Sequence, residues 1–314
     1  MPSSCWLALT PAGRPFQVCG QANLPIARQA VAPNCAILTV ASKSELREIF
    51  MSAGSLRNKA LTALLISDPA QKVAAVAELS EMLVIDCHVE IQAPEGIPGR
   101  PPQPLLVPPQ QVKPRSMGSP QGRAALIHSL AHIEFNAINL ALDILWRFAG
   151  LPEDFYRDWA RVAREEAYHF GLLEGHLRAL GYQYGDLPAH DGLWEMAERT
   201  RDDLLARLAL VPRTLEARGL DASPIVRDKL AGAGDLAAAA IIDIILRDEI
   251  GHVAVGNHWY RYECERQDAD PITRFAELAT DYRAPRLRGP FNLTARREAG
   301  FTDEELEALQ QNAR

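Results

Sequence analysis

The sequence predicts an all-α protein whose centre is a four-helix bundle. Between residues 119 and 265, apolar side chains recur at helical spacing, and no pair of segments has the alternation of a β-hairpin. Proline or aspartate stands at three of the four expected helix starts, and glycine follows three of the four ends. These signals place long helices over residues 119–148, 152–181, 193–219 and 235–265.

The third of these helices contains Pro212, which predicts a kink because proline cannot donate the backbone hydrogen bond of a regular helix. Gly219 is expected to end this helix. Ser223 and Pro224 then predict the cap of a separate short helix that runs to about Ala233. The bundle is therefore expected to contain one bent helix and a short connecting helix before the fourth long helix begins.

Regions on both sides of the bundle are expected to extend it. Residues 42–66 and 68–82 have helical apolar spacing, whereas residues 1–40 have no clear pattern. Nine of the 22 prolines lie within residues 94–120, so this stretch is expected to form an extended strap across the core or, alternatively, a flexible linker. The predicted organisation is an N-terminal helical extension (1–93), the proline-rich strap (94–120), the bundle (121–265) and a C-terminal tail that packs on it (266–314).

Composition and charge limit the function classes. The 314 residues are 47% hydrophobic and 23% charged, with a formal net charge of −7, as in an ordinary globular protein. The negative charge argues against a surface that wraps nucleic acid, and no apolar run is long enough to span a membrane. The N-terminus lacks a signal-peptide pattern, and the five cysteines are scattered without a CxxC pair. We therefore expect a cytoplasmic protein without a disulfide framework or zinc ribbon.

Two repeated motifs indicate the chemistry of the bundle. Glu166 and His169 lie three residues apart in the second long helix, and Glu249 and His252 repeat this spacing in the fourth. Residues at this spacing lie on one face of a helix, one turn apart, so the carboxylate and the imidazole can bind the same metal ion. An isolated motif of this kind is usually a solvated pair on a helix surface.

The apolar neighbours of the motifs argue against solvated pairs. Glu134, Glu166 and Glu249 are each surrounded, at helical spacing, by aliphatic or aromatic residues. Burying a carboxylate in such a stripe is costly unless a cation compensates its charge. Three helices thus direct a glutamate inward, and two of them add a histidine one turn later, which predicts a pair of divalent cations.

The third long helix is expected to supply the fourth carboxylate, for which Glu216 is the best candidate. It follows Leu208 and Ala209 on an apolar stripe. Its depth is an open point, because Glu216 lies near the helix end whereas the other glutamates lie mid-helix; the kink at Pro212 would have to reconcile them. The other acids of this helix share their faces with arginine and are expected to be solvated: Glu195, Glu198, Asp202 and Asp203.

Further residues near the motifs are candidates to support the metals. Asp248 and Glu165 each precede a motif histidine by four residues. Each is either an exposed acid or a group that orients an imidazole, commonly the one on the neighbouring helix. The remaining candidates are two residues that could surround the ligands, Asp243 and His132, and two aromatics that either take part in redox chemistry or only pack, Tyr168 and Trp159.

The order of the candidate ligands resembles the di-iron carboxylate pattern of the ferritin-like superfamily: Glu134, Glu166-x-x-His169, Glu216, Glu249-x-x-His252. Residues 132–134, 215–221 and 288–292 resemble more closely one bacterial family of that superfamily, which carries a domain-of-unknown-function label and is related to the tRNA-modifying di-iron monooxygenase. The resemblance extends from about Ser55 to the C-terminus. It implies a ferritin-like bundle in which Glu166 and Glu249 bridge two metals, while Glu134 with His169 and Glu216 with His252 complete their coordination.

The expected cofactor is a pair of iron ions, with manganese or a mixed Mn/Fe pair as alternatives, because mixed nitrogen and oxygen ligands suit these metals. Such a site predicts an O₂-dependent oxidoreductase, for example a hydroxylase of an unknown small molecule. It would use O₂ or peroxide and receive electrons from a donor protein. Two alternatives are a ferroxidase or peroxide-handling protein without an organic substrate, and a binding or scaffold protein with structural metals.

A tRNA substrate is a further alternative. Five arginines of the tail form a local basic cluster that could contact phosphates: Arg283, Arg286, Arg288, Arg296 and Arg297. Such a run more often forms a solvated face or pairs with nearby acids, here Asp281 and Glu298. The net charge of −7 also argues against nucleic acid.

Overall fold

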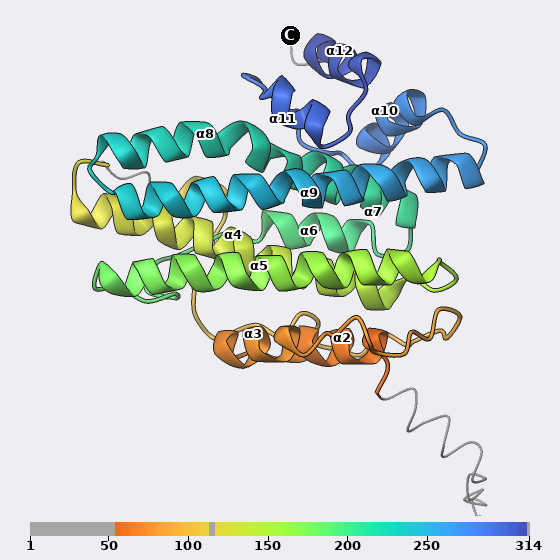
Figure 1. The fold of residues 1–314 in the computed structure, drawn as a ribbon, viewed down its shortest axis with the longest axis horizontal. Helices are drawn as coiled ribbons and strands as arrows, with labels where there is room; N and C mark the ends of the chain where they lie inside the picture. The colour runs from red at the N-terminus through yellow and green to blue at the C-terminus, as the bar shows by residue number, and fades with distance from the viewer. Residues whose placement is uncertain (1–53, 113–116, 313–314) are drawn as a thin grey trace, which may run out of the picture. The chain divides into compact units, whose positions relative to one another are not determined.

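The computed structural model describes residues 54–112 and 117–312, which pack around a main hydrophobic core (Figure 1). The predicted all-α fold is confirmed: within these ranges the elements are helices, and the only β-type pairing is an isolated bridge between Leu106 and Ala189. None of these helices combines the length and the hydropathy that a membrane span requires. Residues 1–40, and the expected helix start at residue 42, lie outside the described ranges.

Three long helices form where their caps and apolar stripes predict them: α4 (Pro120–Arg147), α5 (Glu153–Ala179) and α9 (Leu236–Arg266). Ser119 and Asp235 cap α4 and α9, because each side chain accepts a hydrogen bond from a backbone N–H in the first turn. α4 packs along α5, and α5 contacts α9 (Figure 1).

The predicted single helix over residues 193–219 is wrong, because several elements divide this segment. Asp203 interrupts it: its side chain accepts a hydrogen bond from a backbone N–H and starts a new helix. At Pro212, which has no N–H to donate, the backbone widens into a π-helix. The observed elements are α6 (Gly192–Arg199), α7 (Leu204–Leu210), the π-helix η2 (Val211–Glu216) and α8 (Ala217–Gly232), which packs along α9.

The predicted helix end at Gly219 and the predicted cap at Ser223 and Pro224 are also wrong, because α8 runs through these residues. A proline inside a helix leaves the carbonyl four residues earlier without its usual donor. Here that carbonyl belongs to Leu220, and the side-chain amide of Asn292 in the C-terminal tail donates to it over 3.2 Å. A tertiary contact thus compensates for a break that the local sequence predicts.

Two short helices, α2 (Leu56–Leu65) and α3 (Pro69–Ala77), pack against α4 and α5. The described part of the proline-rich stretch contains one 3₁₀ helix, η1 (Pro109–Gln111), and otherwise no helix before α4, and backbone hydrogen bonds connect it to its neighbours. The N–H of Gly99, for example, donates to the Leu64 carbonyl over 2.8 Å. A Cβ at position 99 would lie 2.1 Å from the carbonyl oxygen of Leu65, so only glycine allows this close approach.

The tail forms three further helices: α10 (Pro271–Asp281), α11 (Leu293–Glu298) and α12 (Asp303–Asn312). α10 contacts α7 and α9, and α11 contacts α8 and α9 (Figure 1). α12 begins with a capping box, in which the N–H of Thr302 donates to Oε2 of Glu305 over 2.8 Å and the N–H of Glu305 donates to Oγ1 of Thr302 over 3.2 Å.

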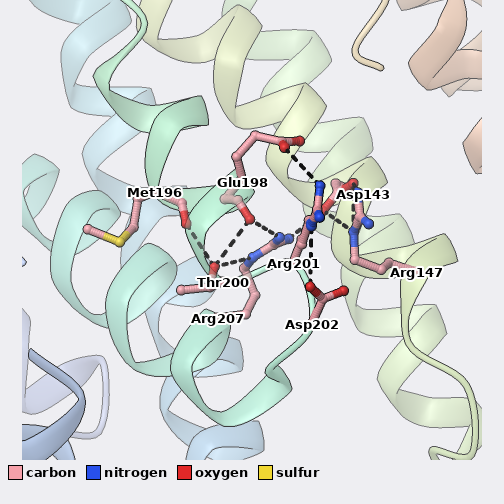
Figure 2. Close-up of polar contacts among 9 residues, drawn as sticks. Asp143, Arg147, Met196, Glu198, Thr200, Arg201, Asp202 and Arg207 are labelled. Carbon is pink, nitrogen blue, oxygen red and sulfur yellow. Dashed lines mark hydrogen bonds and ion pairs between the residues drawn. The ribbon is translucent and has the colours of Figure 1, made fainter. Parts of the chain in front are cut away.

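A buried ion-pair network joins α4 to the segment formed by α6 and α7 (Figure 2). Asp143 of α4 accepts hydrogen bonds from Arg147, one turn later, and from Arg207 of α7 over 2.5 Å. Arg207 also donates to the Thr200 hydroxyl and to the Ala197 carbonyl. Burial alone would raise the pKa of Asp143, but the two guanidiniums, with Arg207 the stronger, hold it below its usual range. The network fixes α7, which leads directly into η2.

Lys72 of α3 is fully buried and connects three segments. Its ammonium group donates to the carbonyls of Leu64 (2.9 Å) and Gly99 (3.4 Å) and to the side-chain oxygen of Asn139 in α4 (2.5 Å). Burial, with the nearby charge of Arg100 as the smaller cause, lowers the pKa of Lys72 to about 7 from its ordinary 10.5. The folded protein therefore gives up this proton at a lower pH than the unfolded chain does.

We predict that this lysine makes the free energy of unfolding rise with pH between about 7 and 10.5, because the unfolded chain binds more protons in that window. Lys72→Met should flatten this rise and should also lower stability, since three buried oxygens lose their donor. Urea denaturation at several pH values measures both effects. Lys229→Met, at an exposed position of α8, is the control. An unaltered pH dependence in the Lys72 variant would contradict the assignment.

Candidate metal centre

Five of the six side chains proposed as metal ligands lie close together, and the sixth, Glu216, lines the same cavity as two of them. One atom from each of four of them lies within 4.8 Å of the others, which is close enough to hold a metal ion: Glu134, Glu166, His169 and Glu249. These four residues and His252 are buried, and they come from α4, α5 and α9. Glu216 ends η2 and is partly buried.

Glu166 lies between the two imidazoles. Its Oε1 is 2.9 Å from Nδ1 of His252, and its Oε2 is 3.5 Å from Nδ1 of His169. Each imidazole also lies near a second glutamate. Oε2 of Glu134 is 3.4 Å from Nδ1 of His169, and Oε1 of Glu249 is 3.8 Å from Nδ1 of His252. Both imidazoles therefore direct Nδ1 toward the carboxylates, with ring centroids 5.6 Å apart.

Each of the six residues has a buried side-chain atom without a hydrogen-bond partner among the described residues: Oε2 of Glu134, both oxygens of Glu166, Nδ1 of His169, Oε2 of Glu216, Oε2 of Glu249 and Nδ1 of His252. Leaving a buried polar atom unpaired costs about 1–3 kcal/mol, and more when the group is charged. Coordinated cations would remove this cost. Carboxylate oxygens and imidazole nitrogens are ligands that iron and manganese accept, so the cluster could hold a metal pair.

Burial and the neighbouring charges shift the pKa values of the cluster's side chains. Burial alone would raise the pKa of Glu166, but the neighbouring imidazoles, with His252 the stronger, hold it well below its usual range. Burial alone would lower the pKa of His169, yet contacts with Glu134 and Glu166 raise it to about 11. Burial, and after it the repulsion from neighbouring carboxylates, raises the pKa of the other three acids: Glu134, Glu216 and Glu249. Ionising all four carboxyl groups at once would therefore require compensating cations.

The outer nitrogen of each imidazole, Nε2, contacts one acid. Nε2 of His169 is 3.1 Å from Oδ2 of Asp248, and Nε2 of His252 is 2.8 Å from Oε2 of Glu165. Each acid contacts the histidine of the neighbouring helix, which is the arrangement considered from the sequence. When the imidazole is neutral, a histidine that donates its Nε2 proton to a carboxylate has no proton on Nδ1, which is then available to a metal.

Asp243 and His132 do not lie beside the ligands, contrary to the expectation from the sequence. Asp243 occupies the exposed face of α9, where it pairs with Arg227 at 3.2 Å. His132 contacts the Tyr184 hydroxyl at 2.9 Å instead. It precedes Glu134 by two residues, and residues at this spacing do not share a helix face.

The two aromatic candidates occupy different environments. Tyr168 is exposed, and its ring centroid is 6.2 Å from that of His169. Trp159 is buried, packs against Phe155 at 6.4 Å between centroids, and has an indole N–H without a partner in the described part of the chain. Trp159 therefore belongs to the core, whereas Tyr168 borders the cluster from the surface.

Glu216 ends the π-helix η2 and lies on the side of the cluster where the cavity is. Its Oε2 is buried, and the residue lines the same cavity as Glu134 and Glu249. Gly256 of α9 allows η2 to approach, because a Cβ at this position would lie 2.5 Å from the Cβ of Pro212. Sequence reasoning missed Gly256, although an isolated glycine inside an apolar helix often marks a close backbone contact.

Arg213, a second residue that sequence reasoning missed, holds η2 from its outer side. It is buried, and it donates to the side-chain oxygen of Asn257 in α9 and to Oε1 of Glu305 in α12, each over 2.7 Å. Its guanidinium also lies 4.4 Å from the ring centroid of Tyr260 and 4.9 Å from that of Phe301. The tail therefore fixes the segment that presents Glu216.

A cavity of about 250 Å³ adjoins the cluster. Glu134, Glu216 and Glu249 line it, and most of its remaining wall is aliphatic, for example Leu130 and Ile245. A mostly apolar cavity with a few convergent polar groups is the usual form of a small-molecule site. No residue of α5 lines this cavity, so it opens on the opposite side of the cluster from that helix.

Fold and site together define an all-helical protein with a buried glutamate–histidine cluster that could hold a metal pair. The chain belongs to the family described as "Protein of unknown function (DUF455)", whose family model matches residues 65–307. An uncharacterised protein of Haemophilus influenzae is 47% identical over 260 residues, which cover 78% of this chain and 90% of that protein. No solved structure matches the chain significantly.

We predict that Gly256→Ala displaces η2 from α9, because the added methyl group would lie 2.5 Å from the Pro212 side chain. The variant should bind less metal than the parent protein and lose about 1–3 kcal/mol of unfolding free energy. Gly251→Ala, in the same helix, is the matched control, since nothing lies within 4 Å of its added Cβ. Metal analysis and urea denaturation compare the two variants, and equal behaviour would mean that this contact does not position Glu216.

We also predict that Asp248→Asn weakens metal binding about 10–100-fold, because the amide no longer supplies the charge that orients His169. The matched control is Asp243→Asn, which changes an exposed acid of the same helix that pairs with Arg227. Competition with a chelator measures both affinities. Retention of full affinity by the Asp248 variant, or equal losses in both variants, would refute the role of Asp248.

Proposed function

We propose that the protein is a di-iron carboxylate protein of the ferritin-like type, and that it catalyses the O₂-dependent oxidation, in particular the hydroxylation, of a small molecule. The proposal depends above all on the six candidate ligands, whose buried atoms lack partners among the described residues, beside an apolar cavity. The ligand composition suits iron, with manganese or a mixed Mn/Fe pair as the alternative.

The contacts support a division of the ligands between two ions. Glu134 approaches His169 on one side of Glu166, and Glu249 approaches His252 on the other. Glu216 shares the cavity wall with Glu249. Glu134 and His169 would help to hold one ion, Glu249 and His252 the other, and Glu166 and Glu216 would add further carboxylates.

Iron bound here would supply the one-electron and O₂ chemistry that the side chains themselves lack. The side chains of the protein would position the metal ligands and provide an apolar environment beside them. Asp248 and Glu165 hold the outer nitrogens of the two histidines, and the aliphatic wall of the cavity limits the access of water. O₂ or peroxide is the proposed co-substrate, and a separate donor protein would supply the electrons.

The cavity favours an organic substrate over the two alternative functions. A ferroxidase or peroxide-handling protein needs a path only for ions or for hydrogen peroxide, and a scaffold with structural metals needs no cavity. A space of about 250 Å³ with a mainly aliphatic wall suits an apolar group better than a hydrated ion.

Iron loading of the full chain under anaerobic conditions tests the proposal. We expect about two iron ions per chain and, after exposure to air, the absorption of an oxidised iron pair. Glu166→Ala and Glu249→Ala should lose most of the iron and the colour, whereas Glu265→Ala, on the exposed surface of α9, should retain both. Full iron content and colour in the first two variants would refute the site.

Oxygen consumption separates the proposed function from its alternatives. A hydroxylase should turn over only with an electron donor and an organic substrate. Catalytic consumption of Fe²⁺ with O₂ or hydrogen peroxide, without any organic substrate, would assign the protein to the ferroxidase or peroxide-handling class. Metal analysis of protein purified from its native host would decide between iron and manganese.

A further inference from the structure

A groove with a different chemistry adjoins the cavity beside the cluster. This arginine groove encloses about 340 Å³, and it shares Arg218 and Ala222 with the apolar cavity. Arg286 and Arg288, in the loop between α10 and α11, line it as well. The two spaces therefore meet at the start of α8, two residues after Glu216.

The three guanidiniums of the arginine groove lack acidic partners. Most other arginines of the described ranges pair with a carboxylate, as Arg297 does with Asp303 at 2.9 Å. Arg218, Arg286 and Arg288 are exposed and form no ion pair with any described residue. Arg286 donates only to a backbone carbonyl of α12, which positions its side chain without neutralising it.

The one acid in the wall of the groove is already compensated. Asp221 lies 2.6 Å from the guanidinium of Arg296, which is fully buried, and it accepts the N–H of Asn292 over 2.9 Å. The groove thus keeps the charge of three arginines in a chain whose formal net charge is −7. Uncompensated guanidinium groups in a concave site are the means by which proteins bind anions, and phosphates above all.

We propose that the substrate is an amphipathic phosphate monoester, an inference that rests on the function proposed above. Its apolar part would enter the cavity next to the three glutamates, and its phosphate would be bound by Arg218, Arg286 and Arg288. Arg218 lines both spaces, so the junction beside it and Ala222 lets one molecule occupy them together. The phosphate then holds the apolar part against the metal ligands.

A small phosphate ester fits this groove better than a nucleic acid does. The predicted cluster of five tail arginines is not available as a whole, because Arg296 is buried against Asp221 and Arg297 pairs with Asp303. Binding of nucleic acid requires a series of phosphate contacts across an extended positive surface. The net charge of −7 does not provide one.

Isothermal titration calorimetry of the metal-loaded full chain tests the inference with n-hexyl phosphate, n-hexanol and inorganic phosphate. The ester should bind at least about tenfold more tightly than either fragment, because it occupies both spaces. Arg218→Gln and Arg288→Gln should each weaken its binding about tenfold, by loss of a charge-assisted hydrogen bond, and leave the affinity for hexanol unaltered. Arg283→Gln is the matched control in the same loop, since Arg283 does not line the groove.

A second variant tests whether the two spaces are connected. Ala222→Phe, at an exposed position that lines both spaces, would fill the junction. It should reduce the affinity for hexyl phosphate to that for inorganic phosphate. The inference is overturned if hexyl phosphate binds no more tightly than inorganic phosphate, if the glutamine variants bind it as the parent does, or if an oligonucleotide binds in preference to it.

Metal content, measured separately in each variant, distinguishes this inference from the proposed function. None of the variants alters a proposed metal ligand, so each should hold as much iron as the parent. If the chain holds no metal and still binds hexyl phosphate in an arginine-dependent manner, the phosphate site is upheld and the di-iron proposal fails. If iron binds as expected and the ester does not, only the substrate assignment fails.

Discussion

Four glutamates and two histidines share the middle of one hydrophobic core, and the remainder of the structure accommodates the charge of this cluster. Burial raises the pKa of three of the carboxyl groups, while Glu166 stays ionised only because two imidazoles flank it. Hydrogen bonds among the described residues do not pair all polar atoms of the cluster, since each member keeps a buried atom without a partner. Positive ions are the natural partners of such a set, and the outer acids Asp248 and Glu165 already orient both histidines to receive them.

Contacts outside the cluster position the helices that carry its side chains. Asp143 and Arg207 fix α7, and Arg213 ties η2 to α9 and to the tail. Asn292 of the tail completes the hydrogen bonding of α8 next to its internal proline. The tail is therefore more than a cover for the bundle, because it determines where the fourth carboxylate lies. The ion pairs of the buried Arg207 and Arg213 give these contacts a specific geometry.

The two sides of the cluster differ in access. On the side of α5, Glu166 contacts His252 of α9. Asp248 and Glu165 contact the outer nitrogens of the two histidines. On the other side, Glu134, Glu216 and Glu249 line a cavity whose wall comes mainly from α4, α6, η2, α8 and α9. The arginine groove shares Arg218 and Ala222 with this cavity, so a charged and an apolar space lie next to each other.

The sequence alone determined the all-α class, the extents of α4, α5 and α9, and the cluster of Glu134, Glu166, His169 and Glu249, because helical periodicity and capping are local properties. It could not give the π-helix, the continuous α8, the outward position of Asp243, or the two adjoining spaces. Each of these depends on residues that are distant in the chain: Gly256 against Pro212, Asn292 beside Leu220, and Arg218 beside the loop of Arg286. Local preference specifies which residues form a helix, whereas packing decides how far that helix continues and which space it encloses.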